Sequence, residues 1–221
     1  MKKIKVALDN KVIQTFIYSV EDSIPDPLTD WFSGWISKYV EERALEAGAN
    51  AFKDKEFIRF GWSRLRIRLV QKILTLEAPD FRTFPVEWKQ DLTIVLQIAV
   101  LHNQVPESFE LKSQSTFLDD TAVVGEAFDQ LPMFMSRSEQ VEDAGGHSGW
   151  FMASMSEEVD TTDESKFKIM SLYEAAVKAP HILEYLAMPE GTQIVFENAN
   201  PKVLHNNQDL SSIKDHYEPI E

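Results

Sequence analysis

Short apolar runs and turn-forming polar residues alternate at the start of the chain. Residues 4–8 and 12–20 flank Asp9-Asn10-Lys11, a pattern typical of two strands joined by a tight turn. After a Pro-Asp-Pro break at 25–27, residues 31–47 have apolar positions three and four apart, with Thr29 or Asp30 as candidate cap and Gly48 beyond the end. We therefore predict a hairpin followed by a helix that packs on it.

The period of the pattern changes between residues 57 and 76. Arg64, Arg66 and Arg68 alternate with three aliphatic residues, which is strand spacing and predicts one or two strands. The arginine row has two interpretations: a stripe that binds an anion or a partner, or a charged face that prevents aggregation of strands. Residues 87–103 return to helical spacing and predict a second helix.

The second half of the chain has shorter elements. Residues 106–130 lack a sustained period and predict an irregular, acidic connection. Beyond them we expect strands at 131–136, 149–155, 167–172 and 192–197, with a helical turn at 173–177 and a helix at 180–186 that has Pro180 at its first position. The predicted fold class is α+β: an N-terminal domain (1–105) with a hairpin, strands and two helices, a linker (106–130), a smaller C-terminal domain (131–200) with a mostly antiparallel sheet, and a polar tail (201–221).

Charge is distributed unevenly along the chain. The net charge is −14, and residues 107–164 alone carry fourteen acidic side chains against two basic ones. Residues 53–72 are basic, with seven cationic side chains against two acidic ones. An acidic surface repels nucleic acid and anionic membranes and attracts basic proteins. The acidic stretch therefore predicts either a docking face for a basic partner or a face that is charged for solubility.

Residues that carry catalytic or metal chemistry are sparse. The chain has no cysteine, and its five histidines are scattered without a zinc-binding spacing. The run from Gly145 to Gly149 lacks the pattern of a phosphate-binding loop and predicts a hairpin loop. We expect no catalytic residue, no cofactor and no metal. No apolar run suits a signal peptide or a membrane span, so the expected location is the cytoplasm.

Several motifs between residues 133 and 197 resemble a known bacterial family. They are Met133-Phe134-Met135-Ser136, Ser148-Gly149-Trp150-Phe151-Met152-Ala153-Ser154, the acidic Glu157-Glu158-x-Asp160, Pro180-x-Ile182-Leu183-x-Tyr185-Leu186 and Pro189-x-Gly191-Thr192. In this order they resemble immunity protein family thirty-three, a group of antidote domains found beside secreted polymorphic toxins. The resemblance implies a non-catalytic protein that binds a toxin of the same cell and blocks it.

We therefore predict an immunity protein that neutralises a cognate toxin with a basic surface. The expected contact residues combine acidic side chains with two aromatic anchors: Glu157, Glu158, Asp160, Asp163, Glu164, Trp150 and Tyr185. Trp150 has an alternative place in the core. A non-catalytic interaction domain of another cytoplasmic pathway and an uncharacterised enzyme are the alternative functions.

Overall fold

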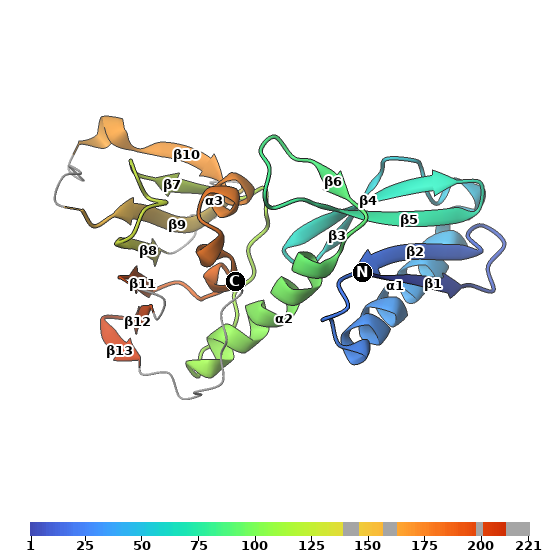
Figure 1. Ribbon diagram of the computed structural model, residues 1–221, viewed down its shortest axis with the longest axis horizontal. Coiled ribbons are helices and arrows are strands. Elements are labelled where there is room, and N and C mark those ends of the chain that lie inside the picture. The colour runs from blue at the N-terminus through green and yellow to red at the C-terminus, as the bar shows by residue number, and fades with distance from the viewer. Residues whose placement is uncertain (139–145, 157–162, 198–200, 211–221) are drawn as a thin grey trace. The chain divides into compact units, whose positions relative to one another are not determined.

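The computed structural model describes residues 1–138, 146–156, 163–197 and 201–210. The chain divides into two compact units, Met1–Gln97 and Ile98–Glu221, called here the N-terminal and the C-terminal unit. The division falls within a helix, α2 (Thr93–Ser108). Each unit builds a mostly antiparallel sheet and adds helices, so the predicted α+β class is confirmed (Figure 1).

The N-terminal unit contains a sheet in the order β1-β2-β5-β4-β3, with β6 paired to β5. Its first two strands pair antiparallel and form the predicted hairpin, whereas β2 runs parallel to β5. The predicted strand region 57–76 contains three strands rather than one or two. The bounds are β1 (Lys2–Ala7), β2 (Thr15–Val20), β3 (Phe57–Phe60), β4 (Ser63–Val70), β5 (Ile73–Pro79) and β6 (Trp88–Lys89).

The first helix, α1 (Asp26–Ala47), begins five residues earlier than predicted. Pro25 occupies the N-cap position and Pro27 lies in the first turn, where a proline fits because the missing N–H has no intrahelical acceptor. The expected cap at Thr29 or Asp30 is therefore wrong. The end is as predicted: Gly48 has a φ of 55°, and the short helix η1 (Gly48–Asn50) follows. Phe32, Ile36 and Val40 point from α1 into the core.

The arginine row lies on β4, where burial alternates as predicted, with Leu65 and Ile67 fully buried. The Arg66 side chain donates to Glu77 Oε2 at 2.7 Å, and its guanidinium carbon lies 5.0 Å from the centre of the Trp88 ring. Arg68 pairs with Asp54 at 3.2 Å. Because these charges have partners within the N-terminal unit, the charged-face interpretation suits the row better than an anion site does.

The second helix begins later than predicted, at Thr93 rather than at residue 87. Asp91 Oδ1 accepts hydrogen bonds from Thr93 N at 3.0 Å and from Thr93 Oγ1 at 2.6 Å, so Asp91 caps the helix. Trp88, expected on the helix, instead belongs to β6 and pairs with Pro79 of β5.

The C-terminal unit contains a sheet in the order β10-β7-β9-β8-β11-β12-β13 (Figure 1). Only β7 and β9 run parallel among these pairs. The bounds are β7 (Thr121–Val124), β8 (Met133–Arg137), β9 (His147–Ser154), β10 (Lys168–Ser171), β11 (Thr192–Phe196), β12 (Lys202–His205) and β13 (Gln208–Leu210).

Three short helices connect these strands: η2 (Glu164–Lys166), α3 (Leu172–Lys178) and η3 (Pro180–Tyr185). The η3 helix packs on one face of the sheet, since the Tyr185 ring lies 5.5 Å from that of Phe196 and His181 Nε2 lies 3.2 Å from Met133 Sδ. Met133, Met135 and Trp150 are fully buried on this face. We call it the inner face.

Two segments differ from the sequence prediction. The connection expected at 106–130 contains β7, which pairs with both β9 and β10. The tail expected beyond residue 200 contributes β12 and β13 to the sheet. Both segments gain order by pairing with strands distant in sequence, which a local pattern does not reveal.

Candidate functional site

The excess negative charge of the protein belongs entirely to the C-terminal unit. Residues 98–221 include 22 acidic and 7 basic side chains, a net charge of −15, whereas residues 1–97 include 14 acidic and 15 basic ones. A unit charged in this way attracts a basic partner over a distance of about one Debye length, ~8–10 Å at moderate salt. The uneven distribution of charge along the sequence therefore coincides with the division into two units.

The predicted acidic contact residues lie in and around the η2 helix. Glu157, Glu158 and Asp160 fall outside the described residues. Asp163 and Glu164 are exposed at the start of η2. The Asp163 carboxylate accepts hydrogen bonds from Ser165 N at 3.0 Å and from Ser165 Oγ at 2.7 Å, so it also caps this turn.

The two predicted aromatic anchors lie in the core and not on the surface. Trp150 is fully buried on the inner face, and its Nε1 donates to the Leu186 carbonyl at 3.2 Å. Tyr185 is 4% exposed and packs edge-to-face on Phe196. Because both rings are buried between η3 and the sheet, the folded unit does not present them to a partner. The alternative core position of Trp150 is the one that the structure has.

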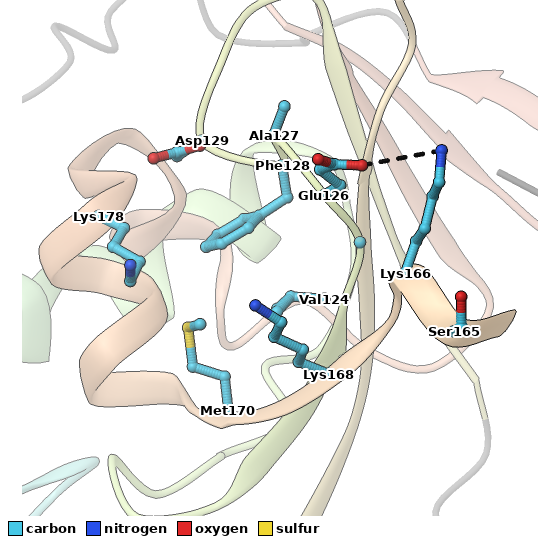
Figure 2. A pocket seen from close by; sticks show the side chains of 11 residues that line it. Val124, Glu126, Ala127, Phe128, Asp129, Ser165, Lys166, Lys168, Met170 and Lys178 are labelled. Atoms are coloured by element: carbon cyan, nitrogen blue, oxygen red, sulfur yellow. Dashed lines mark ion pairs between the residues drawn. The ribbon is translucent and has the colours of Figure 1, made fainter. Parts of the chain in front are cut away.

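A pocket of about 370 Å³ lies beside η2, between the loop after β7, the strand β10 and the helix α3 (Figure 2). Buried Val124 and Phe128 form apolar lining with Met170. Five charged side chains also line it: Glu126, Asp129, Lys166, Lys168 and Lys178. The sequence prediction did not include this pocket, although three lysines between residues 166 and 178, directly after the acidic stretch, were a usable signal.

The pocket combines an apolar lining with charges of both signs. Lys166 pairs with Glu126 at 3.8 Å, the contact that is dashed in Figure 2. In the part of the chain that the structure describes, Lys168 and Lys178 form no ion pair. Ser165 is the hydroxyl side chain of the lining, and no histidine accompanies it there as a base. The pocket can hold a charged or amphipathic side chain of a partner.

Arg137 is a buried cation at the end of β8 and was also missed from the sequence. It is 2% exposed, and it donates from Nε to the Ser148 carbonyl at 3.2 Å and from Nη1 to the carbonyls of Gln114 and Met188 at 2.8 and 2.6 Å. Its guanidinium carbon lies 5.7 Å from the centre of the Trp150 ring. Burial lowers the pKa of Arg137 to about 10. The side chain thus cross-links three segments of the unit.

Two histidines of the C-terminal unit are structural in their contacts. His102 Nε2 lies 2.8 Å from the Leu183 carbonyl, and burial lowers the pKa of His102 to about 4. Burial also lowers the pKa of His181.

Within the described ranges, no group of three or more His, Asp or Glu side chains is placed to hold a metal ion. Nor does any described helix have the length and apolar character that a bilayer crossing requires.

Glu184 is a buried carboxyl group on η3. It is 6% exposed, and burial raises its pKa to about 7, against a partial offset from a hydrogen bond with Tyr185. At pH values between 4.5, the ordinary pKa of this carboxyl group, and about 7, Glu184 keeps its proton in the folded protein and loses it in the unfolded chain. The contribution of Glu184 to stability is therefore complete below pH 4.5 and is lost as the pH rises through about 7.

We expect Glu184→Gln to become more stable relative to the parent as the pH rises from 5 to 8, by roughly 3 kcal/mol for a pKa shift of this size. Urea denaturation of both proteins at several pH values measures the difference. His102 also makes the free energy of unfolding depend on pH, at pH values below about 6.5. This dependence is the same in both proteins, so it cancels from the difference between them. Glu197→Gln, at an exposed position, serves as the control and should show no such trend. A constant difference between pH 5 and 8 would mean that Glu184 titrates normally.

Comparison with known proteins places the C-terminal unit in context. The model of the Imm33-like domain matches residues 101–206, a range that lies within this unit and includes β7 to β12. Searches among curated proteins and among solved structures found no match. The resemblance predicted from residues 133–197 is therefore confirmed, and the C-terminal part of this chain is similar to the Imm33-like domain family.

Proposed function

We propose that this protein is an immunity protein: it binds a toxin produced by the same cell and neutralises it by protein–protein contact. The proposal includes three finer points, namely that the chain has no catalytic activity of its own, that it acts in the cytoplasm, and that the toxin surface it meets is basic. Domains of the immunity-protein type are generally non-catalytic, which supports the first point.

One observation carries the proposal. The residues that match the Imm33-like domain lie within the unit that holds the whole excess of negative charge. A toxin that acted on a nucleic acid would need a basic surface, because its substrate is a polyanion. An acidic antidote would approach such a surface quickly and would compete with the polyanion for it. The exposed Glu126, which lines the pocket in Figure 2, and the exposed Glu164, at the start of η2, would form part of the acidic face of this unit.

The direct test pairs the full-length chain with the protein encoded by the adjacent gene. Co-expression should restore growth of cells that the neighbour alone kills, and the two purified proteins should form a complex by titration calorimetry. If the neighbour is toxic and neither rescue nor a complex is observed, the chain is not its antidote. The interaction-domain and enzyme alternatives would then replace the proposal.

The acidic face makes a prediction of its own. Glu126→Lys combined with Glu164→Lys should raise the Kd for the toxin by about tenfold at low salt, because two attractive charges become repulsive. The difference should shrink as the salt concentration rises toward 0.5 M. The matched control is Glu41→Lys combined with Glu46→Lys, at two exposed positions of α1. It changes the net charge of the protein by the same amount as the first pair. Equal effects of the two pairs would mean that net charge, and not this face, governs binding.

A further inference from the structure

The C-terminal sheet has a second face, opposite the one on which η3 packs. Side chains alternate between the two faces of a strand, so the buried Met133, Met135 and Trp150 belong to the inner face beneath η3. The intervening Phe134 of β8 and Phe151 of β9 point the opposite way and are only half-buried. We call this opposite side the outer face.

Three phenylalanines form a continuous row on the outer face. The ring centres of Phe134 and Phe151 are 5.7 Å apart, and those of Phe151 and Phe167 are 5.3 Å apart. A Cβ at Gly125 would lie 3.1 Å from the Phe167 ring and 3.4 Å from Ala153 Cβ. Glycine at this position therefore lets the Phe167 ring lie close against the sheet and extend the row.

Aliphatic side chains continue the apolar surface to the edge of the sheet. Ile169 of β10 pairs with Val123 of β7, which pairs with Phe151 of β9, so the three residues form one line across three strands. Ile169 is 74% exposed, and Val123 is half-buried. A contiguous apolar surface of this kind marks an interaction site more often than isolated exposed residues do.

The sequence supports the same distinction between the faces. A strand with one solvated face alternates apolar and polar residues, whereas Met133-Phe134-Met135 and Trp150-Phe151-Met152 are apolar at every position. Successive side chains in these runs point to opposite faces of the sheet. The inner residues fill the core, whereas Phe134 and Phe151 on the outer face are only half-buried.

The surroundings of the row indicate the chemistry of what covers it. Glu126 follows Gly125 and Glu164 lies three residues before Phe167, and both are exposed, while Lys166 and Lys168 flank Phe167 in the chain. The unit as a whole has a net charge of −15. An apolar surface on a unit with this excess of negative charge suits a partner that presents an apolar side chain among basic ones. At the sheet edge, the exposed Lys168 on β10 disfavours the addition of another strand. A partner would thus contact the face and not the edge.

We propose that the outer face of the C-terminal sheet, defined by Phe134, Phe151, Phe167, Val123 and Ile169, is the surface that docks the toxin. The matching toxin surface has a protruding apolar side chain ringed by lysine or arginine. This inference rests on the proposed function and adds to it the location and the chemistry of the contact. The acidic residues speed and orient the encounter, and the aromatic row supplies the affinity.

Two variants of the full-length chain test the docking surface by titration calorimetry with the adjacent-gene toxin. Ile169→Arg places a cation opposite the lysine or arginine side chains expected on the toxin. Phe151→Thr removes the central aromatic ring of the row and keeps a residue that favours strands. We expect each to raise the Kd by about tenfold or more. The loss in Ile169→Arg should diminish at high salt, whereas the loss in Phe151→Thr should persist because it is apolar.

The matched control is Leu45→Arg, which makes the same kind of change at an 86% exposed position on α1. It should bind like the parent protein. Thermal unfolding of every variant verifies folding, and Ile169→Arg keeps the test decisive if Phe151→Thr fails to fold. Parent-like affinity of Ile169→Arg would overturn the docking surface while leaving the proposed function intact. Absence of any complex with the parent protein would overturn both.

Discussion

Replacing Arg137 with alanine should lower the free energy of unfolding of the C-terminal unit by about 3–5 kcal/mol. The guanidinium donates to the carbonyls of Ser148, Gln114 and Met188, which belong to three separate segments. Alanine would leave these acceptors without their donor and would open a cavity beside Trp150. Native-state hydrogen exchange at the amides of β9 measures the opening free energy of this unit alone.

Two further variants separate the contributions of charge and hydrogen bonding at this position. Arg137→Lys keeps a cation but cannot bridge three carbonyls, so it should retain only part of the stability. Arg82→Ala, at an exposed position of the N-terminal unit, should change stability by less than about 0.5 kcal/mol. A loss below about 1 kcal/mol in Arg137→Ala would show that water replaces the guanidinium and that the cross-link is dispensable.

Local patterns predicted the strands well and the helix starts poorly. On β4 the alternation of Arg66 with buried Leu65 and Ile67 identified both the strand and its inward face. The helix starts depended on single capping interactions. Pro25 and Pro27 indicate a break when read alone, yet they fit the first turn of α1; Asp91 caps α2 after its apolar pattern has already begun.

Strands that depend on distant partners could not be predicted from their own residues. β7 has four residues, and it lies between β9 and β10, which follow it by more than twenty residues. β12 and β13 follow a polar segment that resembles a fraying tail. In each case pairing within the sheet provides the stability that the local sequence lacks.

The charge of the proposed docking region can be inferred from the sequence, whereas its apolar part cannot. The acidic stretch is visible in composition alone, and exposed Glu164 belongs to it. Side chains alternate between the two faces of a strand, so an aromatic residue faces outward or inward according to whether its position is odd or even. The run Trp150-Phe151-Met152 is apolar at every position, so its parity is hidden until η3 covers one face. The sequence consequently offered Trp150 as both a candidate anchor and a core residue and did not identify Phe151, which is the residue that points away from the core.

This choice between two adjacent aromatics leads to a second large expected effect. Trp150→Ala should destabilise the C-terminal unit by about 3–5 kcal/mol, because it empties a fully buried site and removes the donor to the Leu186 carbonyl. Trp150→Phe should cost less, since it keeps most of the apolar volume. Hydrogen exchange at the β9 amides, as for Arg137, provides the measurement for both variants.

The affinity for the toxin distinguishes a core role from a contact role. If Trp150 is only part of the core, Trp150→Phe should bind the toxin with the Kd of the parent protein, whereas Phe151→Thr should bind more weakly. The opposite result, weak binding by Trp150→Phe at nearly unchanged stability, would mean that η3 moves away from the inner face in the complex and that Trp150 is a contact residue after all. Because the two residues are neighbours on one strand and face opposite ways, this pair of variants tests which face of the sheet the toxin meets.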